Sequence, residues 1–147
     1  MFERKLFAGW GDIDSNSHMK NTAYLDKSGD VRMMFFSENG FSMKDFVSMR
    51  IGPVVMKDEV EYYKEINLLD DIKVTLAIAG LSADCSRFKI RNEFYRTDGK
   101  LAARVTSTGG WMDLTARKLI APPEALYKAL KSLTLTDDYA ELSSSIK

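Results

Sequence analysis

The residues with the clearest chemical potential lie between positions 10 and 26, in the stretch WGDIDSNSHMKNTAYLD. The only histidine of the chain, His18, stands there with Asp14, Asn21 and Tyr24, just before a segment of helical periodicity. A carboxylate can activate water or attack a carbonyl carbon, and a histidine titrates near neutral pH. Unpaired N–H groups in the first turn of a helix can hold an oxyanion. The stretch therefore suits chemistry at a carbonyl group.

Ordinary structural roles compete with this interpretation. An aspartate just before a helix is commonly an N-cap or loop residue, worth about 1 kcal/mol of stability. Asp12 points to the opposite side of an extended loop from Asp14, so we expect it to bond local backbone N–H groups. Tyr24 falls on the buried helical face, as core or pocket lining. For His18, direct chemistry and a role in shaping the loop both stay open.

The elements that position these residues begin with a long helix predicted from Asn21 to Ser37. Its apolar and small residues follow the i, i+4, i+7, i+11 pattern of one helical face. Asn39-Gly40 is expected to end it, because both residues tolerate the left-handed conformation that follows a helix. The predicted buried positions are Tyr24, Ser28, Val31 and Phe35.

Four antiparallel strands are predicted between Pro53 and about Leu114, from runs in which apolar and polar residues alternate. Asp98-Gly99 suits a two-residue hairpin turn with positive φ at both central positions. A first strand at Glu3–Trp10 and a closing helix at Glu124–Leu133 complete the order. A sheet with a single long helix must curl round it to bury its apolar face, which predicts an α+β fold.

This order and the spacing D-x-x-x-H-x-x-N-x-x-Y, formed by Asp14, His18, Asn21 and Tyr24, resemble the hotdog-fold acyl-CoA thioesterases. The likeness is to the branch that includes 4-hydroxybenzoyl-CoA thioesterase and spans roughly residues 2–123. It implies a long central helix wrapped by a curved antiparallel sheet of about five strands, with a short C-terminal helix. One hotdog domain is expected over residues 1–133, with a peripheral tail over 134–147, of which the last dozen residues are expected to be peripheral or frayed.

The resemblance also implies an activity, the hydrolysis of an acyl- or aroyl-CoA thioester. Asp14 would act as general base or nucleophile, the backbone amide of Asn21 would polarise the carbonyl, and His18 would complete the site. Coenzyme A would enter as part of the substrate, with no metal or other cofactor. A non-catalytic acyl-CoA-binding protein and a hotdog hydratase or dehydratase are the alternatives. The latter chemistry generally uses a histidine with an acidic partner.

Two positions depart from the family pattern. Relatives usually have glycine at the position of Ser17 and asparagine at that of Lys20. A glycine there can supply positive φ, so Ser17 would tighten the turn, strain it or add a hydroxyl to the substrate site. Lys20 meets an unfavourable helix dipole unless a carboxylate or a ligand phosphate compensates. These departures concern the substrate and the activity more than the fold.

The family also suggests where the nucleotide of CoA binds and how the subunits assemble. Relatives hold the nucleotide with basic residues in two regions, which here offer Arg87, Arg117 and Lys118. A plain solvated strand face is the other interpretation, and it suits Lys89 and Arg91. A homodimer or homotetramer is expected, with each site at a subunit interface and a partner contributing residues from the segment 53–63.

The overall composition and net charge exclude several classes of protein. With 147 residues, 45% of them hydrophobic, the chain suits one domain with one core. Its 21 basic and 21 acidic residues cancel, so no overall field favours nucleic acid or an anionic membrane. The single cysteine, Cys85, has no internal disulfide partner, and the N-terminal residues lack the apolar stretch of a signal peptide. We therefore expect a cytoplasmic protein without a membrane span.

Overall fold

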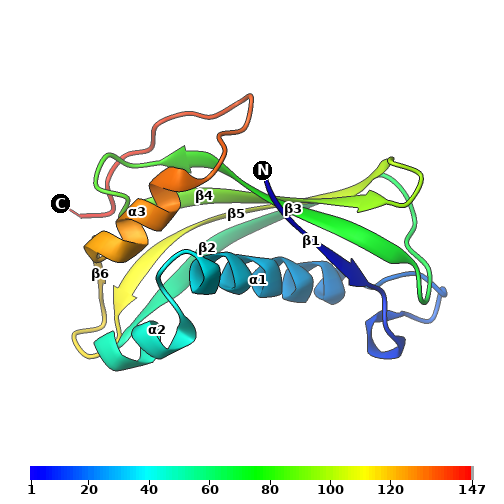
Figure 1. Ribbon diagram of the computed structural model, residues 1–147, viewed down its shortest axis with the longest axis horizontal. Helices are drawn as coiled ribbons and strands as arrows, with labels where there is room; N and C mark the ends of the chain where they lie inside the picture. The colour runs from blue at the N-terminus through cyan, green and yellow to red at the C-terminus, as the bar shows by residue number, and fades with distance from the viewer. Residues whose placement is uncertain (147) are drawn as a thin grey trace.

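The computed structural model, which describes residues 1–146, is built on an antiparallel sheet of six strands (Figure 1). Five strands lie in the order β1-β3-β4-β5-β2, and β6 pairs with β5. The sixth strand, of three residues, was not expected. The elements in chain order are β1 (Phe2–Phe7), η1 (Trp10–Asp12), α1 (Asn21–Glu38), α2 (Met43–Met49), β2 (Ile51–Tyr62), β3 (Asp71–Leu81), β4 (Arg87–Arg96), β5 (Leu101–Asp113), β6 (Lys118–Ile120) and α3 (Glu124–Ser132).

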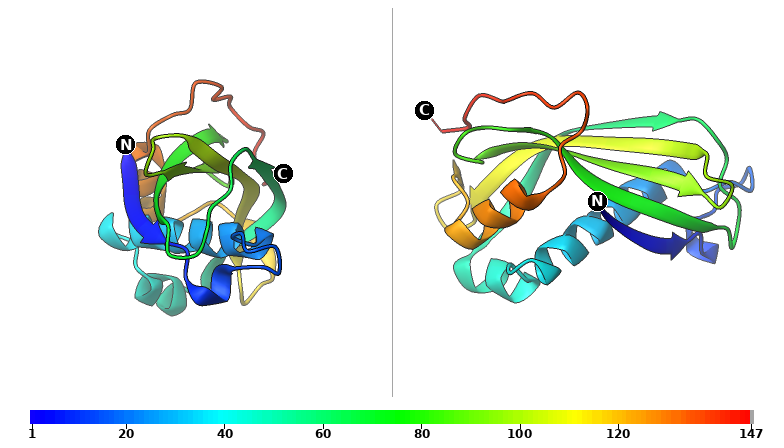
Figure 2. Two further views of the ribbon diagram at one scale, coloured as in Figure 1. Left: turned by 90° about the vertical axis from the view of Figure 1, so that its right-hand side faces the viewer. Right: turned by 45° about the horizontal axis from the view of Figure 1, so that its top comes forward.

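Helix α1, with 18 residues, runs along one face of the sheet (Figures 1 and 2). All four residues expected on its inner face are buried, which confirms the helical periodicity: Tyr24, Ser28, Val31 and Phe35. The helix ends at Glu38, and Gly40 follows with φ of 90°, as the Asn-Gly pair predicted. Burying this apolar stripe against the sheet fixes which side of α1 faces the sheet.

Helix α2 was missed because seven residues carry too little periodicity to stand out. Ser42 and Asp45 form a capping box at its start, with the Ser42 N–H donating to Asp45 Oδ2 over 2.8 Å. Phe46 anchors the helix to the core by stacking on Trp111, with 6.1 Å between ring centroids. The Ser-x-x-Asp spacing was the local signal for this helix.

The turn between β4 and β5 differs from the expected two-residue hairpin. Only Gly99 has a positive φ, of 81°, while Asp98 does not. The Arg96 N–H donates to the Lys100 carbonyl, and the pairing shifts register between Phe94 and Tyr95. Thr97, Asp98 and Gly99 thus form a three-residue loop with a bulge, because Asp98 Oδ1 accepts the Lys100 N–H in place of a left-handed Asp98.

The segment after α3 lies on the side of the sheet away from α1 (Figure 1). Its residues 134–142 are tied to the sheet by backbone hydrogen bonds. β1 pairs with β3 only as far as Leu76, and the segment continues along the same edge. Ile78 exchanges hydrogen bonds with Thr134 and Thr136, and Leu142 donates to Leu81. The backbone groups that β1 leaves open on β3 are thereby satisfied.

Strand β2 forms one edge of the sheet and pairs only with β5 among the described strands. Its other side leaves 12 residues without a neighbouring strand. Edge strands of this length are unusual in isolated chains, because their N–H and C=O groups invite pairing.

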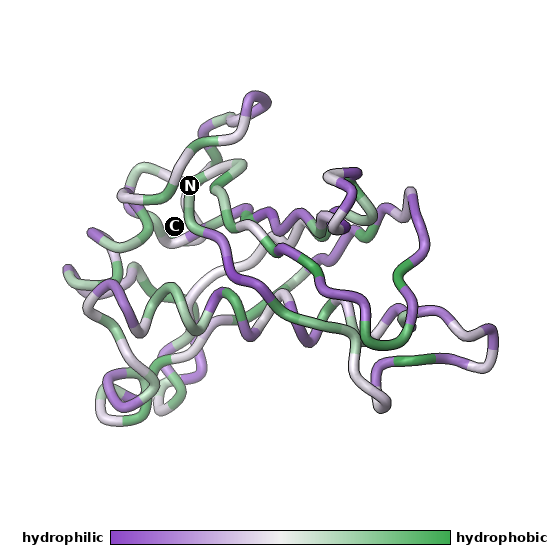
Figure 3. The backbone as a smooth tube through the Cα atoms, turned by 45° about the vertical axis from the view of Figure 1, so that its right-hand side comes forward, coloured by the Kyte–Doolittle hydropathy of each residue, from purple (hydrophilic) through white to green (hydrophobic). Residues whose placement is uncertain are grey.

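Polar and apolar residues alternate along the backbone, so no long stretch is uniformly hydrophobic (Figure 3). Within residues 1–146, no helix is long and apolar enough to cross a membrane.

A substitution at Gly109 tests how closely β2 approaches β5. A Cβ at Gly109 would lie 2.1 Å from the Val54 carbonyl oxygen, whereas one at Gly29 in α1 meets nothing within 4 Å. We expect Gly109→Ala to lower the free energy of unfolding by about 2 kcal/mol or more, because the strands must separate. Gly29→Ala, the matched control, should raise it by about 0.5–1 kcal/mol. Urea denaturation followed by circular dichroism measures both, and equal effects would contradict the packing.

Candidate active site

The loop between η1 and α1 is a tight turn closed by its own backbone. The Asp14 N–H donates to the His18 carbonyl over 2.8 Å, and the Ser17 N–H donates to the Asp14 carbonyl over 3.1 Å. Ser17 has φ of 67°, the left-handed conformation that glycine adopts without strain. Ser17 is exposed and does not line the cleft described below, so its place is in the turn.

The carboxylate of Asp14 is oriented by one oxygen and open at the other. Oδ1 accepts the N–H groups of Asn16 at 2.8 Å and His18 at 3.2 Å. Oδ2 has no hydrogen-bond partner in the part of the chain that the structure describes. The turn thus fixes the side chain while leaving one oxygen available to water or substrate.

Helix α1 begins at Asn21 with an unoccupied donor. Lys20, the N-cap residue, makes no side-chain capping bond, and the Asn21 amide oxygen accepts the Thr22 N–H at 3.0 Å. The backbone N–H of Asn21 has no acceptor among residues 1–146. The helix dipole adds partial positive charge at this end. This N–H can therefore donate to an oxygen that becomes negative.

A cleft of about 550 Å³ brings the predicted residues together. Asp14, His18, Asn21 and Tyr24 all line it. The opposite wall was missed, because nothing in the sequence links the segment after β2 to the loop. The contact is made by the backbone, with the Met19 N–H donating to the Ile66 carbonyl over 2.8 Å. This wall consists of Tyr62, Tyr63, Lys64, Glu65 and Ile66.

Within the cleft, His18 has an acidic partner. Its Nε2 lies 3.1 Å from Glu65 Oε2, and both side chains are partly exposed. This contact holds the loop against the segment after β2. The same contact gives a histidine with a carboxylate neighbour, the pair expected of a hydratase.

Tyr24 forms the floor of the cleft and belongs to the core as well. Its ring lies edge-on to Tyr62 and Phe94, with centroids 5.3 and 5.2 Å away. Burial, followed by the nearby Tyr62 and Asp14 charges, raises the pKa of Tyr24 to about 12. The phenol therefore stays protonated at neutral pH, so it can donate or accept a hydrogen bond but cannot act as a base.

Arg87, Arg117 and Lys118 lie away from this cleft. Tyr62 of the cleft pairs with Ala103 on β5, whereas Arg87 pairs with Gly110. Ala103 and Gly110 are seven residues apart, or about 23 Å along a strand. Lys118 pairs farther along β5, with Asp113. The structure therefore does not bring these basic residues to Asp14 of the same chain.

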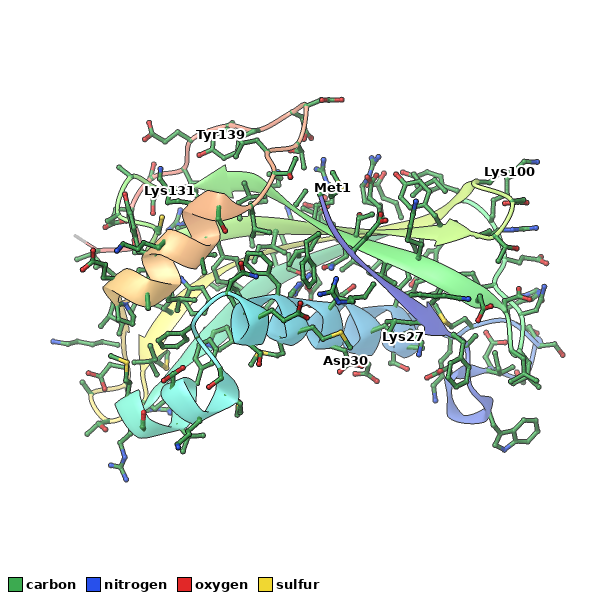
Figure 4. The ribbon with its side chains drawn as sticks, in the orientation of Figure 1. Met1, Lys27, Asp30, Lys100, Lys131 and Tyr139 are labelled. Carbon is green, nitrogen blue, oxygen red and sulfur yellow. The ribbon has the colours of Figure 1, made fainter. Side chains whose placement is uncertain are left out.

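Asp12 has the structural role that its position predicted. Its Oδ2 accepts the Gly9 N–H at 2.8 Å and lies 3.0 Å from Nζ of Lys27, which α1 presents to the loop (Figure 4). Burial acts to raise the pKa of Asp12, but the Gly9 N–H and the ammonium groups of Lys27 and Lys20 lower it overall. Asp12 also supplies the carboxylate that the charge of Lys20 requires at the start of the helix.

Among residues 1–146, no group of three or more His, Cys, Asp or Glu side chains is arranged to hold a metal ion.

Comparison with known proteins defines the class of this protein. The family model described as the thioesterase-like superfamily matches residues 8–130. The chain therefore belongs to the thioesterase-like superfamily, and the hotdog thioesterase resemblance drawn from the loop motif is confirmed at that level. No curated protein sequence matches it significantly.

Solved structures agree with this fold. A protein of Staphylococcus aureus solved in complex with CoA is 24% identical, with a TM-score of 0.80 over 88% of this chain and 81% of that one. A 1,4-dihydroxy-2-naphthoyl-CoA thioesterase from Synechocystis is 18% identical, with a TM-score of 0.79 over 90% and 96%. A probable thioesterase from Escherichia coli is 19% identical, with a TM-score of 0.75 over 91% and 99%. These likenesses establish the fold.

The ion pair of Asp12 gives a pH-dependent prediction. Because its pKa is lowered in the folded state, its stabilisation is full above the unfolded pKa near 4 and is lost as pH falls through the folded value. We expect Asp12→Asn to lower the free energy of unfolding by about 1–2 kcal/mol at pH 7. The difference from wild type should shrink below pH 4. Urea titrations at pH 7, 5 and 3 measure it, and a pH-independent difference would contradict the charge-based role.

Proposed function

We propose that this protein hydrolyses the thioester bond of an acyl- or aroyl-CoA. One arrangement carries the proposal: Asp14, whose Oδ2 is open, and Asn21, whose backbone N–H is unoccupied, line the same cleft. The first is a base or nucleophile, and the second is an oxyanion donor. In this proposal α1 is the central helix of the hotdog fold, and its N-terminus serves the reaction.

The general-base route needs only water and substrate. Asp14 Oδ2 takes a proton from a water molecule while the water oxygen attacks the thioester carbon. The carbonyl oxygen then becomes negative. The Asn21 N–H donates to that oxygen. The intermediate then expels the CoA sulfur, which receives the proton, and leaves the free acid. Along the nucleophilic route Asp14 attacks first and expels the CoA thiolate, which leaves a mixed anhydride between Asp14 and the acyl group. Water then cleaves the anhydride, the Asp14 carboxylate is regenerated with the free acid, and a proton from this water neutralises the thiolate.

The N–H donor is the part of the site that the backbone supplies. Removing one oxyanion donor typically costs about 10²- to 10³-fold in rate. Because the donor at Asn21 is a main-chain group, the side chain of Asn21 is expected to matter less than the start of the helix. Tyr24 and His18 shape the cavity around these groups, and the proposal requires no metal or redox cofactor.

A second copy of the chain completes the proposed enzyme. The free side of β2 offers 12 residues for pairing, and the apolar Val55 and Met56 on it are 43% and 56% exposed. Antiparallel pairing of two β2 strands would bring the far end of one chain to the Asp14 cleft of the other. That end carries Arg117 and Lys118, which would then serve the phosphates of CoA. We place this homodimer, or a tetramer built from it, in the cytoplasm.

The central test is Asp14→Asn. Asparagine keeps the Oδ1 acceptor that the turn needs but offers no basic oxygen. We expect kcat for acyl-CoA hydrolysis to fall by about 10²- to 10⁴-fold with little change in unfolding free energy. A thiol-release assay over short, long and aromatic acyl-CoAs measures it, with a Ser15→Ala variant in the same loop as control. Full activity in Asp14→Asn would overturn the assignment.

The contact between His18 and Glu65 favours a second candidate function, that of a hotdog hydratase or dehydratase acting on acyl chains. His18→Ala separates the two. A hydratase would lose its activity in this variant and keep it in Asp14→Asn, when assayed with enoyl-CoA by loss of absorbance. A thioesterase would show the opposite order. An acyl-CoA-binding protein without turnover would hydrolyse none of the panel.

An acidic substitution on β2 tests the proposed homodimer. We expect Val55→Glu to yield a monomer, because in an antiparallel pairing that sets Ile51 opposite Tyr62 of the partner subunit each new glutamate would face Asp58 of the partner subunit. The rate of acyl-CoA hydrolysis should fall as the dimer is lost. Light scattering after size exclusion measures the mass, with Leu135→Glu, at an equally exposed apolar residue of 54% exposure, as control. A wild-type monomer with full activity would contradict the proposal.

A further inference from the structure

A second stretch of strand edge lies on β3, and a later segment of the same chain covers it. β1 pairs with β3 from Asp71 to Leu76 and leaves residues 77–81 without a neighbouring strand on that side. Residues 134–146, which we call the strap, run along this part of β3 on the side of the sheet away from α1 (Figure 1). The strap lies beyond residues 8–130, which the family model matches. Its role must therefore be inferred from its own contacts.

The part of the β3 edge under the strap is the part without charge. Residues 77–81, AIAGL, include no charged residue and no proline, whereas the part that β1 covers includes Asp71 and Lys73. Apolar edges that lack charge and proline pair readily with another strand, and the same edge of a second copy matches them in character. A bare β3 edge would therefore pair with its like.

The strap occupies this edge through backbone hydrogen bonds. The Ile78 N–H donates to the Thr134 carbonyl over 2.8 Å, and the Ile78 carbonyl accepts the Thr136 N–H at 2.9 Å. Farther along, two more β3 carbonyls accept N–H groups of the strap at 3.1 and 3.0 Å. Gly80 permits the close approach, since a Cβ there would lie 2.9 Å from the Ala140 carbonyl oxygen. The strap thus uses the backbone groups that a second strand would need.

Two side-chain contacts tie the strap to the rest of the sheet. The Arg91 guanidinium donates to both carboxylate oxygens of Asp138, over 2.8 and 3.0 Å. The Arg91 side chain is only 13% exposed, and its Nε donates to Thr106 Oγ1 over 3.1 Å. Near the end of the strap, the Ser144 hydroxyl donates to Asp84 Oδ2. Both ties can be removed without altering the backbone of the β3 edge.

We propose that the strap closes the β3 edge against a second copy of the chain, so that pairing of sheet edges stops at two chains. The inference rests on the homodimer paired through β2 in the proposed function. A chain with two open edges would extend into a ribbon, because every added copy offers a new free edge. The outer edge of β1 is blunted in another way, since β1 has six residues and includes Glu3, Arg4 and Lys5.

Release of the strap in the full-length chain tests the inference. Arg91→Ala combined with Asp84→Ala removes both ties, and Gly80→Val displaces the strap by a steric clash. Arg96→Ala is the matched control, since Arg96 lies on the same strand and pairs with Asp98 at 3.2 Å, away from the strap. Hydrogen exchange followed by mass spectrometry should show faster exchange of residues 134–142 in both release variants. Exchange as slow as in the wild type would contradict the contacts on which the inference depends.

Light scattering after size exclusion measures the assembly. Both release variants should form assemblies of more than two chains, with a mass that rises with concentration, whereas the wild type and Arg96→Ala stay at two chains. Adding Val55→Glu, which blocks β2, should return the release variants to two chains, now paired through β3. Two results would overturn the inference: a wild-type mass in variants whose strap exchanges fast, or large assemblies that Val55→Glu does not reduce.

The same measurements separate this inference from the proposed dimer. A monomeric wild type would contradict β2 pairing. In that case the release variants should still reach two chains, with or without Val55→Glu, and this result would support the closed β3 edge alone. Release variants that remain monomeric would overturn it. Neither measurement depends on acyl-CoA hydrolysis, so loss of the proposed activity would leave the inference standing.

Discussion

Burial of one face of α1 against the sheet is the constraint on which the candidate site depends. Val31 and Phe35 on that face are almost fully buried, and each contributes about 1.5–3 kcal/mol of hydrophobic stabilisation. This packing fixes where the helix starts and where its first N–H groups point. The loop before it is then tied on both sides, by Met19 to Ile66 and by Lys20 to Asp12. A carboxylate in such a loop is held in place without being buried, so it stays accessible.

A single chain separates the parts that the proposed enzyme needs. Its polar cleft lies at one end of the edge strand β2, and the basic turn that carries Lys118 lies at the other. In the proposed dimer, two β2 strands related by a two-fold axis would bring these parts together. The charged residues in the middle of β2, Lys57, Asp58 and Glu59, suit such a strand, because charge on an open edge discourages indiscriminate pairing.

Strong local patterns in the sequence predicted most of the fold. The face of α1, the four long strands and α3 follow from periodicity, and the Asp14–Tyr24 spacing pointed to residues that line one cleft. The far wall of the cleft was not predicted from the sequence. Glu65 lies beside His18 because of how the chain folds, and no local spacing in the sequence indicates this contact. Arg87 was proposed from the family resemblance as a contact of the CoA nucleotide, and the structure places it toward the other end of the sheet from the cleft of its own chain. Helix α2 was too short for periodicity, and the Asp98-Gly99 turn depended on a side-chain bond that dipeptide rules ignore.

The pairing of residues 134–142 with β3 affects the order in which the molecule can fold. Their partners on β3 lie more than fifty positions earlier in the chain. Contacts between such distant segments form slowly, because the intervening chain must first be ordered. During synthesis, the second half of β3 therefore has an open edge until residues 134–142 have emerged, and the nascent chain passes through a stage that is more prone to aggregate than the folded protein.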